Sequence, residues 1–262
     1  MKISDGNINI IRVAETDSTS KEIVREYESK SQTSNFKPQT SISVLQADYQ
    51  TAGRGQQGNS WESERGKNLL FSVMLWPKGV AVRRQFRLSQ AMAVALCEEL
   101  ETKSQTSNLQ SQISIKWPND IYYGEKKLSG TIIETTWAGD MLERCVLGVG
   151  INVNQQVFCS DAPNPISLCQ IVGHEVDRDV LLAGVLQRFV PLYERLMAGD
   201  EEDLVRRYVS HLFWREGLHR YSDADGEFEA EIVDVAADGH LTLCDTEGRE
   251  RCYYFKELKF RI

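Results

Sequence analysis

The stretch QTAGRGQQGNSW, Gln50–Trp61, holds three glycines within six residues and an arginine between the first two. Glycine lets a backbone approach a ligand closely and turn its amides toward it, because no Cβ intervenes. Arg54 adds a permanent charge and a planar fork of donors suited to carboxylate or phosphate. A mobile hairpin connection would have the same composition, so this stretch alone leaves both interpretations open.

The flanking residues indicate that this stretch is a long loop between two strands. An apolar run ends near Ala47, and a second run covers Leu69–Leu75. The loop is not a P-loop, because no Gly-Lys-Ser/Thr follows, and no helical pattern opens after it as a dinucleotide fingerprint requires. A nucleotide that binds here must therefore use another architecture.

The bulk composition excludes several classes of protein. The 262 residues suffice for one large domain and a small one, and the net charge of -8 disfavours nucleic acid as a partner. The six cysteines form no Cys-x-x-Cys pair and the four histidines are scattered. We therefore expect neither a structural zinc site nor a disulfide framework, but reduced thiols in a cytoplasm. No apolar run has signal-peptide or membrane length, so we expect no membrane partner.

A strand is predicted at Ile8–Val13 and a helix at Lys21–Glu28, with several N-cap candidates between them. Ser18 and Thr19 either only cap this helix or bring hydroxyls and amides to a polar ligand group at its N-terminus.

A second informative stretch, Ile113–Thr136, contains Lys116-Trp117-Pro118-Asn119-Asp120. It reads as a strand stopped by proline, then a hairpin turn and a returning strand. Strand alternation puts Lys126 and Lys127 on opposite faces, so only one of them can point into a site. The next strand, Arg144–Val153, carries Gly148 and Gly150 on one face, which indicates a close approach by another group.

The C-terminal part changes its hydrophobic period. Helices are predicted at Arg84–Leu100, Asp179–Leu196 and Asp203–Leu212, whereas a period of two begins after Trp214. Asp-Gly and Glu-Gly pairs then suggest hairpin turns. We predict a small β-barrel over Arg215–Ile262, which divides the chain into domains at 1–213 and 214–262.

The motifs occur in one order that resembles the biotin protein ligases, or biotin–[acetyl-CoA-carboxylase] ligases. The resemblance is carried by Gly-Arg-Gly with Trp61, Lys-Trp-Pro-Asn-Asp, Lys127-Leu-Ser-Gly130 and Gly148-Val-Gly150-Ile-Asn152. It covers nearly the whole chain. It implies an α+β fold: a mixed, mainly antiparallel sheet with helices on one face, followed by an SH3-like C-terminal barrel.

The resemblance also implies a two-step activity in the cytoplasm. Biotin and ATP, with Mg²⁺, form biotinyl-5′-AMP, and a lysine of a biotin carboxyl carrier domain then takes the biotinyl group. The barrel would help to bind ATP or dock this acceptor, or serve only as a packing appendage. The sequence does not decide between a monomer and a homodimer. We expect an unpaired edge strand near Arg144–Val149, which could pair with a second subunit or with the acceptor domain.

The site residues follow from the same resemblance. Lys127 and Arg54 would be catalytic, and Asp120 would contact Mg²⁺. The biotin-binding residues would be Ser18, Thr19, Ser20, Gln50, Gly53, Arg54, Gly55, Gln56, Lys127, Gly130, Gly148 and Gly150. The nucleotide-binding residues would be Arg54, Trp61, Lys116, Asn119, Asp120 and Asn152. Trp117 is expected to be core.

Three differences from the family pattern bear on function. Gln56 stands where many bacterial relatives have a second arginine, which weakens the expected retention of the adenylate, and Ser20 replaces a frequent asparagine. The pattern begins within the first twenty residues, so we expect no N-terminal DNA-binding domain. Two rival functions stay open: a lipoate or octanoate ligase of the same fold, and a biotin-binding regulator without catalysis.

Overall fold

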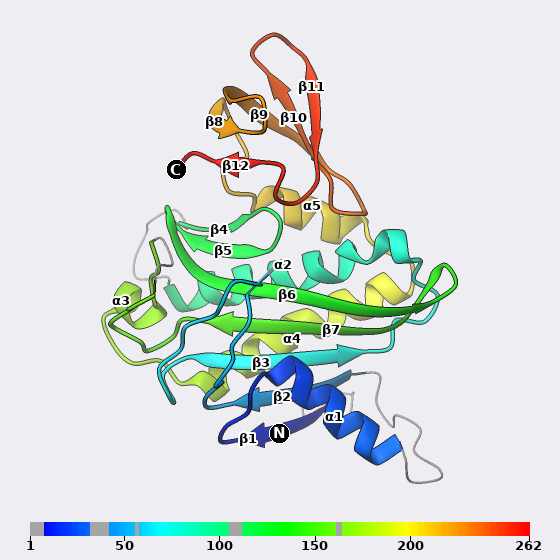
Figure 1. Ribbon diagram of the computed structural model, residues 1–262, viewed down its shortest axis with the longest axis vertical. Helices are drawn as coiled ribbons and strands as arrows, with labels where there is room; N and C mark the ends of the chain where they lie inside the picture. Colours follow the sequence, from blue (N-terminus) through cyan, green and yellow to red (C-terminus); the bar gives the residue numbers. More distant parts are fainter. Residues whose placement is uncertain (1–7, 32–41, 56–57, 105–111, 161–163) are drawn as a thin grey trace.

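A seven-stranded sheet forms the centre of the computed structural model, which describes residues 8–31, 42–55, 58–104, 112–160 and 164–262. Its strand order is β1-β2-β3-β7-β6-β5-β4 (Figure 1). Only β1 and β2 pair in parallel; the other neighbours are antiparallel. The strands are β1 Asn9–Val13, β2 Ile42–Ala47, β3 Leu69–Leu75, β4 Ile113–Lys116, β5 Asp120–Tyr123, β6 Lys126–Ala138 and β7 Met141–Ile151.

Two long helices cover one face of this sheet. They are α2 (Phe86–Ser104) and α4 (Arg178–Met197), and both lie behind the strands in Figure 1. The expected fold class is confirmed, and α1 (Thr19–Ser31) adds a smaller layer on the opposite face. The short helices α3 (Leu168–Val172) and α5 (Glu202–Ser210) and the 3₁₀ turn η2 (Val82–Arg84) complete this part of the chain.

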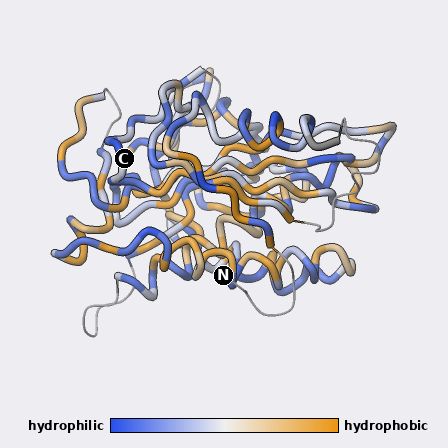
Figure 2. Tube along the Cα trace, turned by 90° about the horizontal axis from the view of Figure 1, so that it is seen from below, coloured by the Kyte–Doolittle hydropathy of each residue, from blue (hydrophilic) through white to orange (hydrophobic). Residues whose placement is uncertain are grey.

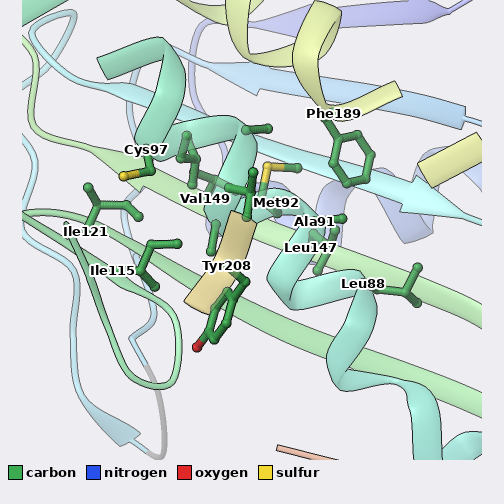
Figure 3. Packing of buried hydrophobic residues seen from close by; sticks show 14 of the residues in the cluster. Leu88, Ala91, Met92, Cys97, Ile115, Ile121, Leu147, Val149, Phe189 and Tyr208 are labelled. Carbon is green, nitrogen blue, oxygen red and sulfur yellow. The ribbon is translucent and has the colours of Figure 1, made fainter. Parts of the chain in front are cut away.

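Strand alternation divides the apolar residues between the two faces. Val44, Val73 and Leu147 belong to the large core under α2 and α4, whereas Leu45 and Met74 pack in the small cluster with α1. Figure 3 shows α2 and α4 side chains meeting the strands, and Figure 2 shows the apolar segments gathered along the central strands. Each fully buried large apolar side chain contributes roughly 1.5–3 kcal/mol.

One expectation about the sheet is wrong. The strand near Arg144–Val149 is not an open edge, because β7 pairs with β3 on one side and with β6 on the other. The edges of the described sheet are β1 and β4. The sequence could not show this, because strand order depends on pairings between residues distant in the chain.

The C-terminal residues form a separate antiparallel sheet, in agreement with the expected SH3-like domain. The strand order is β11-β10-β9-β8-β12. The predicted turns are present, with Gly239 and Gly248 at φ 101° and 78°, a backbone region that favours glycine. The strands are β8 His219–Ser222, β9 Glu227–Val235, β10 Leu241–Asp245, β11 Glu250–Tyr253 and β12 Lys259–Phe260. Among the described residues, no helix is long and apolar enough to cross a membrane.

Candidate functional site

The described residues on either side of positions 56 and 57 in the glycine-rich stretch pair with each other as a hairpin over the sheet. The amide of Gly55 donates to the carbonyl of Asn59 at 2.6 Å, and the amide of Trp61 donates to the carbonyl of Gly53 at 3.0 Å. A Cβ at Gly53 would lie 2.7 Å from the Trp61 carbonyl oxygen, so only glycine fits this turn. Gln56 lies outside the described residues.

A cleft of about 1040 Å³ opens under this hairpin. It is bounded by the start of α1, by β5, β6 and β7, and by the C-terminal segment after β11. It collects all the described residues that the sequence marked for a site except Gly53: Ser18, Thr19, Ser20, Gln50, Arg54, Gly55, Trp61, Lys116, Asn119, Asp120, Lys127, Gly130, Gly148, Gly150 and Asn152.

One end of the cleft is polar but uncharged. The Gln50 side-chain oxygen accepts hydrogen bonds from the amide (2.7 Å) and the hydroxyl (3.1 Å) of Thr19. Ser72 donates its hydroxyl to that of Thr19 at 2.8 Å and lies 3.1 Å from that of Ser20. Ser72, on β3, did not stand out in the sequence, because a serine inside an apolar strand has no local signal of function.

The two glycines of β7 make room at the floor of the cleft. A Cβ at Gly150 would lie 2.5 Å from the Trp61 indole, and one at Gly148 would collide with the Ser20 hydroxyl. The close approach predicted from the sequence is therefore confirmed. The indole nitrogen of Trp61 is buried and has no hydrogen-bond partner among the residues that the structure describes. This nitrogen is a donor that a ligand's acceptor could satisfy.

Two cations of the cleft, Lys127 and Arg54, are paired with carboxylates. The Lys127 ammonium lies 2.6 Å from Asp120, whereas Lys126 is exposed on the other face of β6, as predicted. Arg54 forms an ion pair with Glu134, a residue for which the sequence gave no signal. Burial lowers the pKa of Lys116, whose ammonium donates to the Tyr122 hydroxyl at 3.2 Å.

Two asparagines of the motifs form hydrogen bonds to backbone carbonyls beside the site. The side-chain amide of Asn119 donates to the carbonyl of Thr131. That of Asn152 donates to the carbonyl of Ile166 at 3.2 Å. Both side chains are buried. A structural role thus accompanies the nucleotide contact that the resemblance implies for them.

The C-terminal domain supplies a wall of the cleft through residues that the sequence did not single out. Residues 255, 256 and 258–261 line it, among them the exposed Lys259. Trp117, buried as expected, donates its indole N–H to the Gly239 carbonyl at 2.9 Å and meets Phe255 edge to face. The motif strand and the small domain are therefore joined directly at the site.

Residues 15–152 match the model of the biotin/lipoate A/B protein ligase family. The bifunctional ligase/repressor BirA of Bacillus subtilis is 30% identical over 227 residues, 80% of this chain and 64% of that protein. The biotin–[acetyl-CoA-carboxylase] ligase of Paracoccus denitrificans is 29% identical over 51% of this chain and 55% of its own length. The chain thus spans less than two thirds of these curated relatives.

A solved structure extends the similarity to the whole fold. The biotin protein ligase of Aquifex aeolicus in complex with biotin and ATP superposes with a TM-score of 0.74 and 26% identity. The alignment covers 97% of this chain and 98% of that one. The similarity therefore includes the C-terminal domain as well as the central sheet.

Proposed function

Because the chain belongs to the biotin/lipoate A/B protein ligase family, we propose that it activates biotin with ATP and transfers it to a lysine of a biotin carboxyl carrier domain. The observation that carries the proposal is the composition of a single cleft. Its uncharged polar end suits a neutral urea-like ring, and its cationic part suits a carboxylate beside a phosphate.

The first step joins two anions and therefore needs fixed positive charge. A biotin carboxylate oxygen attacks the α-phosphorus of ATP, the bond to the β-phosphate oxygen breaks, and pyrophosphate leaves. Lys127 and Arg54 stabilise the charge that develops on the phosphorus oxygens. The described residues of the hairpin, 53–55 and 58–61, cover the adenylate and exclude water from its mixed anhydride.

In the second step, a lysine amine of the carrier attacks the biotinyl carbonyl carbon. An amide bond forms, AMP leaves with the electron pair of the broken C–O bond, and the amine releases a proton to solvent. The carrier must reach the open side of the cleft. The sheet edge β1 is a candidate surface for the carrier or a second copy of the chain, whereas β4 is already bridged by residues 211–213.

ATP would lie between Trp61 and the C-terminal wall, close to Lys116, Asn119 and Asn152. The residues present also fit Mg²⁺, which takes one or two carboxylates together with substrate phosphates. Asp120 pairs with Lys127 through Oδ2, and its Oδ1 lies toward Gly130 in the cleft. Bound there, the ion would neutralise phosphate charge.

All six cysteines are free thiols, which supports a cytoplasmic location.

The test is biotin-dependent exchange of pyrophosphate into ATP. We expect exchange with biotin, none with lipoate or octanoate, and a loss of roughly 10²–10³-fold in Lys127→Ala. Lys126→Ala is the matched control, because it removes the same charge one residue away on the exposed face. Exchange with lipoate or octanoate instead of biotin would mean that the substrate is one of these other acids, used by a ligase of the same fold. No exchange with any acid would leave a binding protein and overturn the ligase function.

A further inference from the structure

Three metal-ligating side chains meet on the side of α2 that faces α5, away from the cleft lining. Cys97 and Glu101 stand one helical turn apart on α2, and His211 is the C-cap residue of α5. One donor atom from each lies within 4.8 Å of the others. Within the described residues, no other set of three Cys, His, Asp or Glu side chains meets this condition.

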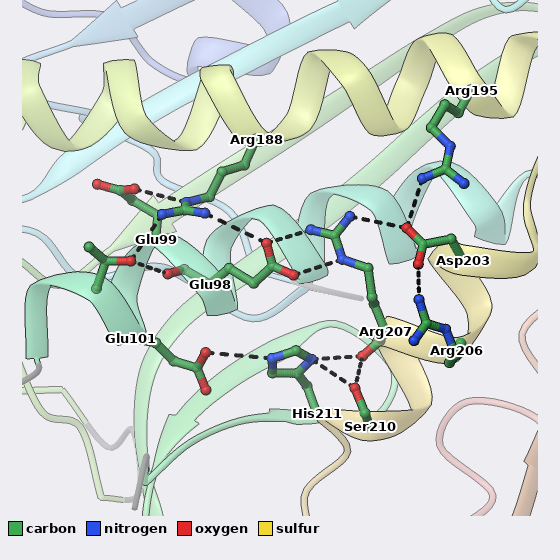
Figure 4. Close-up of polar contacts among 11 residues, drawn as sticks. Glu98, Glu99, Glu101, Arg188, Arg195, Asp203, Arg206, Arg207, Ser210 and His211 are labelled. Atoms are coloured by element: carbon green, nitrogen blue, oxygen red, sulfur yellow. Dashed lines mark hydrogen bonds and ion pairs between the residues drawn. The ribbon is translucent and has the colours of Figure 1, made fainter. Parts of the chain in front are cut away.

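Hydrogen bonds orient His211 for ligation. Its Nδ1 lies 2.7 Å from the carbonyl oxygen of Arg207, and a carbonyl only accepts, so Nδ1 carries the proton. The other ring nitrogen, Nε2, lies 3.5 Å from a Glu101 carboxylate oxygen (Figure 4). A metal-binding histidine typically has this arrangement, in which the distal N–H is fixed by a backbone carbonyl.

From this geometry we propose that Cys97, Glu101 and His211 bind a zinc-like divalent cation that links α2 to α5. Thiolate, imidazole and carboxylate together suit zinc, which binds these donors at about 2.0–2.3 Å. Donors around such a tetrahedral ion stand roughly 3.3–3.8 Å apart. The His211–Glu101 separation of 3.5 Å already fits, and the thiol lies within 4.8 Å of both other donors. Solvent fills the fourth position.

The burial of the three groups gives the ion a route to the site. Cys97 is fully buried in the large core, near Ile115 and Ile121 in Figure 3, whereas Glu101 and His211 reach the surface. The ion would enter from their side and bind the thiol last. Its charge would compensate for burying a thiolate, since burial, together with the charges of Glu101 and Glu98, raises the pKa of Cys97.

The location suggests a structural role. The carbonyl of His211 accepts from the amide of Ile115 at 2.7 Å, and Ile115 belongs to β4, which leads directly into the Lys116–Asp120 motif. The chain then passes from α5 into the C-terminal sheet. An ion here would link α2 to the segment that joins the two parts of the molecule.

The alternative without a metal is an ion pair between His211 and Glu101, beside the buried thiol of Cys97. The hydrogen bond to Glu101 raises the pKa of His211, which favours this pair in the metal-free protein. A metal-binding experiment on untagged, reduced protein separates the two. We would titrate Co²⁺ into the apo-protein, follow the thiolate-to-cobalt absorption band, and compete the Co²⁺ with Zn²⁺.

We expect one Co²⁺ per chain, a thiolate band that Zn²⁺ abolishes, and a melting temperature raised by roughly 3 °C or more by saturating Zn²⁺. His211→Gln and Cys97→Ala should weaken Zn²⁺ binding by at least about tenfold, and Cys97→Ala should lose the band. Cys145→Ala, which removes a thiol that is equally buried, is the control. His211→Gln keeps the core intact should Cys97→Ala fail to fold. No thiolate band, or equal Zn²⁺ affinity in wild type and His211→Gln, would overturn the site.

Discussion

Arg54 and Glu134 form a two-bond ion pair between the hairpin and β6, with Nη1–Oε1 at 2.9 Å and Nη2–Oε2 at 3.1 Å. Both side chains are more than a third exposed. Solvent therefore screens the pair, and its contribution to stability is at most about 1 kcal/mol. Its importance lies in the guanidinium, which an anionic ligand must share with Glu134 or take from it.

Glu134→Gln should therefore strengthen binding of an anionic ligand. Without the competing carboxylate, we expect the dissociation constant for biotinyl-5′-AMP to fall by up to about fivefold, corresponding to about 1 kcal/mol. Isothermal titration calorimetry would measure it. Glu175→Gln, which breaks the exposed pair with Lys67 far from the hairpin, is the control. Weakened binding in Glu134→Gln, of the size caused by Arg54→Ala, would mean that the pair persists in the bound state.

Asp120→Asn separates two roles of this carboxylate. If Asp120 binds Mg²⁺, the Mg²⁺ concentration for half-maximal exchange should rise roughly tenfold at fixed ATP, because one of few protein ligands is lost. Pyrophosphate exchange over a Mg²⁺ titration measures this. If Asp120 serves only as the partner of Lys127, the Mg²⁺ dependence will stay unchanged and the biotin affinity alone will shift.

Gly150→Ala should displace the Trp61 indole. The new methyl group would lie 2.5 Å from the ring, and such overpacking costs about 1–3 kcal/mol of unfolding free energy. Urea unfolding would measure the loss. In a Trp61→Ala background, the same substitution should cost much less, because the colliding ring is gone. An equal cost in both backgrounds would place the strain elsewhere.

The C-terminal sheet should be sensitive to acid through Asp245. Hydrogen bonds from the Arg249 amide first, and from Arg251 and Glu247, lower its pKa from 3.8 to about 2. The folded state therefore binds this proton less readily than the unfolded state. The contribution of Asp245 is complete above the unfolded pKa of 3.8 and disappears as the pH falls toward 2.

Asp245→Asn should lower stability at pH 7 and flatten its dependence on pH between 4 and 2. Urea unfolding of both proteins across this range would show the difference. Glu250→Gln, on the exposed side of β11, is the control and should keep the wild-type slope. A slope unchanged in Asp245→Asn would assign the acid sensitivity to other carboxylates.

The sequence predicted those parts of the site whose signals are local. Alternation along one strand indicated that only one of Lys126 and Lys127 points into the site, and the resemblance selected Lys127. Glycine spacing indicated a close approach at Gly148 and Gly150, which line the cleft. These inferences worked because a strand's period fixes where neighbouring side chains point. The order of the strands is not local, so β7 was wrongly expected at an edge.

The sequence could not predict which residues, distant in the chain, the fold brings into contact. Glu134 lies 80 residues from Arg54, and nothing in its own surroundings distinguishes it from a solvated glutamate. Likewise, the spacing rules for metal sites look for neighbouring ligands, whereas His211 joins Cys97 and Glu101 from another helix. The resemblance implied that the C-terminal barrel helps to bind ATP or dock the acceptor, but it did not indicate which residues line the cleft, although Lys256, Lys259 and Arg261 form a basic run there.

The two ion pairs, Lys127 with Asp120 and Arg54 with Glu134, also bear on selectivity in a crowded solution. An unpaired ammonium or guanidinium would attract any abundant small anion, such as inorganic phosphate. Here, such an anion must displace a carboxylate already in contact, so it gains little. A ligand that presents a carboxylate and a phosphate together engages both cations at once. At these two cations, the free protein thereby discriminates against single anions.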